Sequence, residues 1–290
     1  MATLLRLTLP TPLEYFAALV SEDGHINLLE AAASIAQDEF PQFDVQNVVN
    51  EVDRLGERLL RRLPADAGAS HRVKALTRYF HAELGFAGNV NNYYDSGNSY
   101  VHHVLATRRG IPISLAVIFL ELAQALGLRV QGVSFPGHFL VKLKIGTNEV
   151  LLDPFTGESL SRSRLDEILQ GYVEAQGLDR DADLPLEYFL QAATPRQILA
   201  RMLRNLKEIH RQAKDWPRLL AVQQRLVLLL PQDAAERRDR GLVLEALGHW
   251  PAAAEDLTHY LSAQGQAAPD SDELRARVEK LRSFGQPPMH

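Results

Sequence analysis

The sequence predicts an α+β domain over residues 1–185, with a helix-rich front and a small antiparallel sheet, followed by an all-α repeat tail over residues 186–290. Two observations carry this prediction. Short β-type segments separated by turn residues are confined to the region between Leu128 and Pro154. Further along, Trp-Pro pairs at Trp216 and Trp250 stand 34 residues apart, and each opens an amphipathic stretch.

Composition narrows the class of protein. A chain of 290 residues with 46% hydrophobic and 23% charged residues is typical of a soluble globular protein with room for two domains. The net charge of -5 gives no bulk attraction to nucleic acid or to an anionic membrane, so neither is an expected partner. There is no cysteine, which excludes disulfides, thiolate metal sites and cysteine nucleophiles.

The N-terminal stretch is not typical of a secretory signal. Pro10, Pro12 and Glu14 interrupt its apolar character, and no small-residue cleavage site follows. No run of about 18 apolar residues occurs anywhere in the sequence. We therefore expect a cytoplasmic protein.

Amphipathic spacing predicts three helices in the first third of the chain. Apolar residues recur at intervals of three and four in residues 27–37 and 45–63, and a further helix is expected over about 71–84, ended by Gly85. A short helix should follow within 101–110, and the stretch RGIPISLAVIFLELAQALG predicts another over 112–126.

A loop rich in Gly, Asn, Asp and Ser spans residues 88–98. Its tyrosines indicate an ordered loop and not a flexible linker. Tyr93, Tyr94 and Asn98 are candidate binding residues, because aromatic and amide groups could line a groove. The alternative is that they lock the loop by hydrogen bonds.

Three strands are predicted within residues 129–135, 138–145 and 149–155. In the second, Val141 and Leu143 alternate with lysines, as in a half-exposed antiparallel strand. Residues 146–148 (GTN) read as a hairpin turn between the second and third strands.

The repeat in the tail has the period of the tetratricopeptide repeat, a helix-turn-helix unit. Gly241 and Ala253 fall at the small positions of its two helices, and Pro231 closes the earlier repeat. Trp216 and Trp250 are therefore candidate binding residues of a protein-binding tail. A plain helical bundle with a chance tryptophan spacing is the alternative.

His138 and Asp153 suggest catalytic chemistry. One begins a predicted strand and the other ends the next, so the hairpin can bring them side by side. Asp153 would then fix the imidazole tautomer and raise its basicity, as the third member of a triad does. A nucleophile at the start of the 112–126 helix would gain from the helix dipole. The spacing alone is also compatible with a purely structural role for His138.

The order GIP, ALGL, GH and LDP along this region resembles the transglutaminase-like core. More specifically, the segments YYDSGNSYVHHVLATRRGIPISLAVIFLELAQALGL, FPGHFLVK and LLDPFTGE are similar to the bacterial SirB family, transglutaminase-like proteins with C-terminal tetratricopeptide repeats. The resemblance covers nearly the whole chain. It implies a papain-like core for the first domain, and it makes His138 the catalytic histidine and Asp153 the catalytic aspartate.

The same resemblance implies a missing nucleophile. Aligned without gaps, the family's cysteine position falls on Pro112, which has no nucleophilic group. Proline suits the first turn of a helix, because the N–H it lacks would be unpaired there. The resemblance thus implies a pseudoenzyme that keeps His138 and Asp153 as a vestigial pair.

Ser114 is the alternative nucleophile. It stands two residues beyond Pro112, about 200° around a helix, and a serine needs a stronger base than a thiol does. A hydrolase or acyl transferase using Ser114, His138 and Asp153 stays open. The structural alternative is a first-turn hydroxyl bonded to a free backbone N–H.

No metal or cofactor is expected. His102 and His103 are adjacent and would point apart on a helix, and there is no HExxH motif. A mixed metal site of His103, His138 and Asp153 stays open, although nothing in the spacing favours it.

Arg108 and Arg109 precede the helix tip and could bind an acidic partner or a peptide carboxylate. Solvated arginines, or arginines paired with local acids, are the alternative. Taken together, the sequence favours a non-catalytic regulatory or scaffolding protein over an enzyme. Its expected partner is a protein or peptide, bound by the cleft, by the repeat tail or by both.

Overall fold

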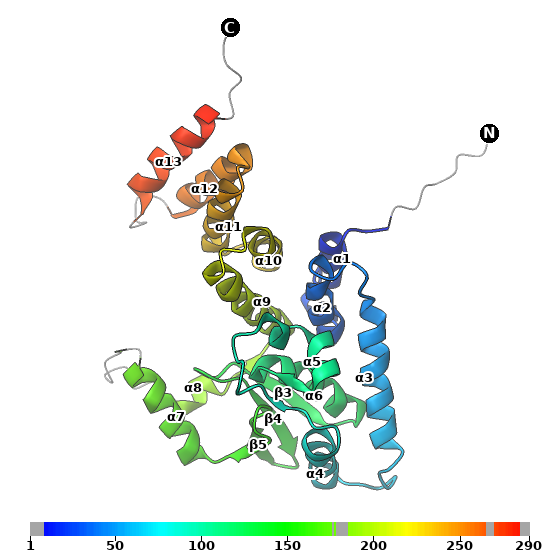
Figure 1. Ribbon diagram of the computed structural model, residues 1–290. Coiled ribbons are helices and arrows are strands. Elements are labelled where there is room, and N and C mark those ends of the chain that lie inside the picture. Colours follow the sequence, from blue (N-terminus) through cyan, green and yellow to red (C-terminus); the bar gives the residue numbers. More distant parts are fainter. Residues whose placement is uncertain (1–8, 176, 178–184, 265–269, 285–290) are drawn as a thin grey trace, which may run out of the picture. The chain divides into compact units, whose positions relative to one another are not determined.

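The computed structural model describes residues 9–175, 177, 185–264 and 270–284 (Figure 1). This part of the chain divides into two compact units. The larger comprises Ile26–Gln37 and Gln42–Met202. The smaller comprises the segment that ends at His25, Asp38–Pro41 and the chain from Leu203 onward.

These units differ from the predicted boundary after residue 185 at both ends of the chain. The first helix, α1 (Pro12–Leu19), packs on α10 (Trp216–Leu229) and so belongs to the smaller unit. Residues 186–202 belong to the larger unit, where Leu186, Ile198 and Leu199 are buried. The boundary of a domain that folds by itself stays a prediction.

Two helices of the larger unit, α2 (Leu28–Ser34) and α3 (Val45–Leu60), begin after side chains that cap them. Asn27 accepts a hydrogen bond from the backbone N–H of Glu30, and Asp44 accepts one from that of Gln46. The helices are α2 (Leu28–Ser34), α3 (Val45–Leu60), α4 (Ala69–Arg78), α5 (Val101–Thr107), α6 (Pro112–Ala125), α7 (Arg162–Ala175) and α8 (Leu186–Phe189). The first five agree with the predicted helices within a few residues, whereas the sequence analysis did not predict α1, α7 or α8.

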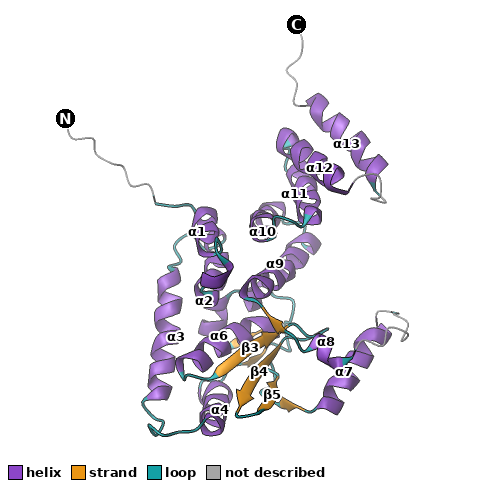
Figure 2. Ribbon diagram, turned by 180° about the vertical axis from the view of Figure 1, so that it is seen from behind, coloured by secondary structure: helices purple, strands orange, loops and turns teal. Residues whose placement is uncertain are grey.

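Five strands of the described residues form an antiparallel sheet in the order β6-β5-β4-β3-β7. The strands are β3 (Arg129–Val133), β4 (Leu140–Ile145), β5 (Asn148–Leu152), β6 (Ser159–Leu160) and β7 (Ala192–Ala193). The pairing of Ile145 with Asn148 confirms the tight hairpin, with Gly146 at φ +62°. Figure 2 shows β3, β4 and β5 side by side. A short parallel pair joins β1 (Ala87–Gly88) to β2 (Arg109–Gly110).

Helix α6 lies at the centre of the larger unit. Nearly all of its side chains are buried, including Leu115, Ile118 and Phe119, and it packs against α3, β3 and β4. A helix that is apolar on all sides is a core helix. In β4, Leu140 packs with Leu165 of α7 and Leu186 of α8. The alternate residues Val141 and Leu143 point to the other face of the strand. The sheet therefore sits between helices, and the tip of α6 is fixed by the core.

The smaller unit is helical. Besides α1 and α10 it contains α11 (Ala234–Ala246), α12 (Trp250–Gln264), α13 (Ser271–Phe284) and the end of α9 (Pro195–Gln212). A Cβ added at Gly241 would lie 3.0 Å from Leu257 and 3.3 Å from the carbonyl oxygen of Ala253. Gly241 on α11 and Ala253 on α12 thus let two helices approach closely, as the repeat register predicts.

Candidate functional site

The tip of α6 is built by Gly110, Ile111 and Pro112. Pro112 occupies the first turn of α6 and is buried, where its lack of an N–H costs no helical hydrogen bond. Gly110 precedes it in β2. A Cβ there would lie 2.8 Å from Oγ of Ser114 and 3.0 Å from Val104, so only glycine fits without a shift.

The hydroxyl of Ser114 is committed to the backbone. Its Oγ lies 2.6 Å from the carbonyl oxygen of Asn98 and 3.0 Å from that of Ile111, and it accepts a hydrogen bond from the N–H of Ile111 at 3.2 Å. Ser114 is fully buried. The structure thus gives Ser114 the contacts expected of a structural first-turn hydroxyl.

His138 and Asp153 lie close together at one end of the β4–β5 hairpin. Nδ1 of His138 is 4.0 Å from Oδ2 of Asp153, beyond hydrogen-bond distance. Oδ1 of Asp153 accepts a hydrogen bond from the N–H of Phe155 at 2.8 Å. Nδ1 of His138 is buried and has no hydrogen-bond partner among the described residues. The predicted juxtaposition is therefore present, with one imidazole nitrogen left unpaired.

A second histidine borders Asp153, and the sequence analysis missed it. His81 lies in a π-helical turn (Tyr79–Glu83) that extends α4. Its Nδ1 is 2.9 Å from the carbonyl oxygen of Phe86, and its Nε2 is buried without a partner among the described residues. Burial lowers the pKa of His81, partly opposed by the hydrogen bond to Phe86 and by the charge of Asp153.

Gly157 makes room for the His81 ring. Its φ is +81°, and a Cβ at this position would lie 2.8 Å from the ring. The π-helical turn was the signal in the fold, because such turns occur frequently at functional sites. In the sequence, the glycine of the LDPFTGE segment was the only hint.

The loop before α5 is locked from inside. The side-chain amide of Asn98 donates to the carbonyl oxygens of Asn92 at 2.6 Å and Tyr93 at 3.1 Å, and its oxygen accepts from the amide of Asn89 at 2.9 Å. Asn98 is 1% exposed. Its amide is thus used within the loop, as in the locking alternative.

Tyr93 and Tyr94 remain available on the surface. Tyr94 is 77% exposed, and its ring meets that of Tyr93 edge to face at 5.4 Å between centroids. Tyr93 also lies 6.2 Å from the ring of Phe155, two residues after Asp153. Burial of its hydroxyl raises the pKa of Tyr93. The aromatic loop therefore adjoins the segment that carries Asp153.

The two arginines before the helix tip have different roles. Arg109 donates from Nη1 to the carbonyl oxygen of Gly85 at 2.7 Å, so its charge supports a turn. Arg108 adopts a left-handed conformation, with φ 59°, and its guanidinium lies 4.7 Å from the centre of the Phe86 ring. Nη1 of Arg108 is buried without a partner among the described residues.

Arg201 of α9 is a further residue that sequence reasoning missed. It donates from Nη1 to Oγ of Ser134 at 2.7 Å and to the carbonyl oxygen of Phe135 at 3.2 Å. Its guanidinium lies 5.6 Å from the Phe139 ring. These residues flank His138 on both sides in the sequence, so Arg201 fixes the turn that presents the histidine.

Trp216 and Trp250 open α10 and α12, as the repeat predicts. Trp250 packs on the core shared by α11, α12 and α13, and its ring lies 5.5 Å from that of Phe284. Trp216 follows Asp215, whose carboxylate accepts a hydrogen bond from the N–H of Arg218. Both tryptophans are half-buried. The contacts of Trp250 are those of a packing residue.

Two kinds of feature are missing from the part of the chain that the structure describes. No helix there is long and apolar enough to cross a membrane. No group of three or more His, Cys, Asp or Glu side chains there is placed to hold a metal ion. His102 and His103 stand 6.5 Å apart between ring centroids, nearly perpendicular.

The chemical capability of this arrangement follows from its parts. His138 and Asp153 supply a base and a carboxylate that can orient it. Covalent catalysis also needs a nucleophile within hydrogen-bond reach of the base. Pro112 offers no such group, and the hydroxyl of Ser114 is bonded to the backbone.

Comparison with known proteins agrees with this description. A family model for the transglutaminase-like superfamily matches residues 46–204, and one for a tetratricopeptide repeat matches residues 206–279. A "UPF0162 protein" of Xylella fastidiosa is 37% identical over 241 residues, which is 83% of this chain and 85% of that protein.

A "UPF0162 protein" of Vibrio cholerae is 28% identical over 266 residues, which is 91% of this chain and 96% of that protein. No solved structure matches the chain. The match to residues 46–204 contains the tip of α6, His81, His138 and Asp153. The chain therefore belongs to the transglutaminase-like superfamily and carries a tetratricopeptide-repeat region after its transglutaminase-like domain.

Proposed function

We propose that this protein is a non-catalytic member of its superfamily that binds a protein or peptide segment and acts as a regulatory or scaffolding factor. One observation carries the proposal. The hydroxyl of Ser114 is held 2.6 Å from the carbonyl oxygen of Asn98, and Pro112, where the resemblance puts the family's cysteine, has no nucleophilic group. With neither residue free to attack a substrate, the site keeps a base and loses its nucleophile.

The retained pair has a use in binding. The His138 side chain is 37% exposed, so its imidazole can hydrogen-bond to a bound segment, and Asp153 lies 4.0 Å from its Nδ1. Next to Asp153, the exposed rings of Tyr93 and Tyr94 offer an amphipathic surface. These groups suit a peptide backbone with an aromatic or apolar side chain.

The repeat region supports a protein partner, because tetratricopeptide repeats generally mediate protein-protein interactions. Assignment to the SirB family and a cytoplasmic location belong to the same proposal. The alternative, a hydrolase or acyl transferase using Ser114, His138 and Asp153, would need the Ser114 hydroxyl to leave three backbone contacts.

Site-specific photocrosslinking tests the binding function. A photoreactive phenylalanine analogue replaces Tyr94 in the full chain, which is expressed in cells of its natural source. A discrete crosslinked protein band is expected. The matched control carries the analogue at Tyr188, an exposed tyrosine of α8 at 57% exposure. The same bands from both positions, or none from position 94, would reject the loop as a binding surface.

A covalent probe tests the absence of catalysis. A fluorophosphonate probe for activated serines is expected to label the wild type no more than Ser114→Ala. Labelling that disappears in both Ser114→Ala and His138→Gln would instead establish the hydrolase.

A further inference from the structure

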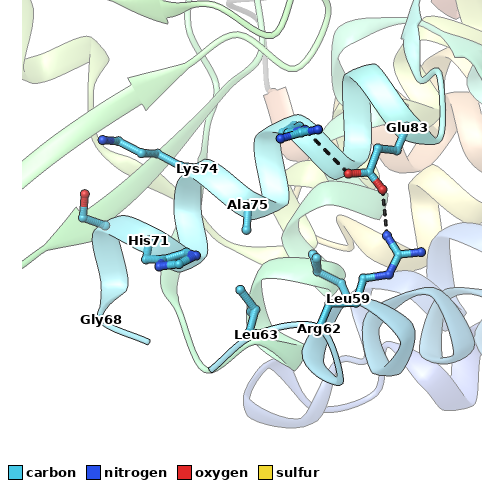
Figure 3. A pocket seen from close by; sticks show the side chains of 10 residues that line it. Leu59, Arg62, Leu63, Gly68, His71, Lys74, Ala75 and Glu83 are labelled. Atoms are coloured by element: carbon cyan, nitrogen blue, oxygen red, sulfur yellow. Dashed lines mark hydrogen bonds and ion pairs between the residues drawn. The ribbon is translucent and has the colours of Figure 1, made fainter. Parts of the chain in front are cut away.

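A groove in the larger unit combines positive charge with an apolar floor. It lies where the end of α3 and the following turn meet α4, and its cavity volume is about 740 Å³. Figure 3 shows its lining. The lining residues are Leu59, Arg62, Leu63, Gly68, Ser70, His71, Lys74, Ala75, Arg78 and Glu83. We call it the α3–α4 groove.

The charge of the groove is unbalanced. Glu83 is its one carboxylate, and two arginines share it: Arg62 at 2.7 Å and Arg78 at 3.8 Å. Lys74 and His71 are exposed, and their side chains make no hydrogen bond or ion pair with another described residue. Three permanent cations thus stand against one anion, in a chain whose net charge is -5. A positive groove in a protein of negative net charge favours a negatively charged partner at that groove.

The charges lie at two ends of the groove. Figure 3 shows Lys74 and His71 at one end and Arg62 with Glu83 at the other, with Leu63 and Ala75 between them. Leu63 and Ala75 are half-buried, so each leaves part of its apolar surface to solvent. A ligand with negative charge at two points and an apolar group between them complements this pattern.

We propose that the α3–α4 groove binds an acidic segment of a partner protein, in which an apolar side chain lies between acidic residues. Carboxylates of the segment pair with Lys74 and with the two arginines. The apolar side chain covers Leu63 and Ala75. A backbone N–H of the segment donates a hydrogen bond to the carboxylate of Glu83.

Nucleic acid fits the same groove less well. The lining holds no Phe, Tyr or Trp on which a base could stack. Glu83, which pairs with both arginines, would also repel a phosphate group placed beside them. An acidic peptide supplies donors for Glu83 as well as carboxylates for the cations, and so satisfies every charge. The inference concerns a second surface and goes beyond the function proposed for the site at His138 and Asp153.

Fluorescence anisotropy with the full chain tests the proposal. The probe is a short labelled peptide of glutamate and leucine, and its matched control has glutamine in place of every glutamate. The acidic peptide is expected to bind more tightly than its control. Its affinity should fall as NaCl rises from about 50 mM to about 500 mM, because salt screens exposed charges.

Two variants with opposite expected effects locate the binding. Lys74→Gln should weaken binding of the acidic peptide by about two- to fivefold, the range of an exposed ion pair. Glu83→Gln should strengthen it by a similar factor, since the glutamine oxygen still accepts the backbone N–H while Arg62 and Arg78 are freed, and a misfolded variant would not gain affinity. Lys144→Gln, which removes an exposed lysine of β4, is the matched control and should leave the affinity unchanged.

Three outcomes overturn the proposal. The first is equal affinity for the glutamate and glutamine peptides, and the second is equal loss in Lys74→Gln and Lys144→Gln. The third is tighter binding of a single-stranded RNA of similar length than of the acidic peptide. Crosslinking at Tyr94 tests only the site at His138, and peptide binding tests only the α3–α4 groove. Failure of one proposal is therefore distinguished from failure of the other.

Discussion

Ser114 and Asn98 are joined by a hydrogen bond of 2.6 Å between a side-chain hydroxyl and a backbone carbonyl, although they stand 16 residues apart in the sequence. The bond ties the tip of α6 to the loop that carries Tyr93 and Tyr94. The residue that the sequence offers as a nucleophile therefore links helix α6 to this loop by a buried hydrogen bond. Its loss should be felt in stability and not in catalysis.

Replacing Ser114 with alanine should destabilise the larger unit. The carbonyl of Asn98 and the N–H of Ile111 would lose a buried partner, which costs about 1–3 kcal/mol of the free energy of unfolding. Urea denaturation followed by circular dichroism measures the change. Ser70→Ala, at an exposed serine of α4, is the control and should change little. Equal stability of the two variants would contradict the role given to Ser114.

Gly88→Ala should disturb the segment that holds Asp153. A Cβ at Gly88 would lie 2.2 Å from the ring of Phe155, so the ring must move. Overpacking of this kind costs about 1–3 kcal/mol. Gly171→Ala in α7 is the matched change, because its Cβ would meet no atom within 4 Å. It should stabilise α7 by about 0.5–1 kcal/mol. Thermal unfolding separates the two, and a loss of the same size in both would argue against the packing explanation.

His81 should make the larger unit less stable in mild acid. Burial lowers its folded-state pKa below the ordinary value of 6.5, so the unfolded chain binds a proton more readily. The contribution of neutral His81 to the free energy of unfolding is complete above pH 6.5. It is lost as the pH falls from there through the lowered pKa of the folded state. Urea denaturation of wild type and His81→Gln between about pH 5 and pH 8 measures the slope, which should be smaller in the variant.

Exposed His259 supplies the control for this comparison. His259→Gln should keep the wild-type dependence of stability on pH. If His81→Gln keeps it as well, the buried imidazole is not the group that titrates.

The fold could be predicted where local pattern and tertiary contact agree. Apolar spacing located α3 and alternation located β4, because each buries one continuous set of side chains, whereas α6 was located by its apolar run after a first-turn proline. Helix α7 was missed: among its described residues only Leu165 is buried, so its sequence carries a weak apolar pattern. The packing of α1 on α10 was also beyond the sequence, since it joins segments some two hundred residues apart.

The site could be predicted only in part. His138 and Asp153 stood out because a hairpin brings neighbouring strand ends together, which is a local relation. His81 and Arg201 reach the same region from helices far away in the chain, and no spacing rule links them to it. For Ser114 the sequence left two roles open, and its hydrogen bond to the carbonyl oxygen of Asn98, 16 residues away, could not be predicted from spacing.

Pro112→Cys tests directly whether the tip of α6 faces His138. The chain has no cysteine, so this substitution gives a single thiol whose reactivity can be followed without background. A helix N-terminus and a neighbouring protonated histidine both lower the pKa of a thiol below about 8.5. The rate of alkylation by iodoacetamide, measured against pH, should therefore rise at a lower pH than for a free thiol.

The double variant Pro112→Cys/His138→Gln separates the two causes. The helix contribution persists in it, whereas the contribution of the imidazole is lost, so the alkylation profile should move to higher pH. Asp153→Asn in the Pro112→Cys background should move it in the same direction, because the group 4.0 Å from Nδ1 that can orient the imidazole is then changed. Identical profiles with and without His138 would mean that residue 112 does not occupy the nucleophile position. The proposed lack of catalysis would then need another explanation than the proline.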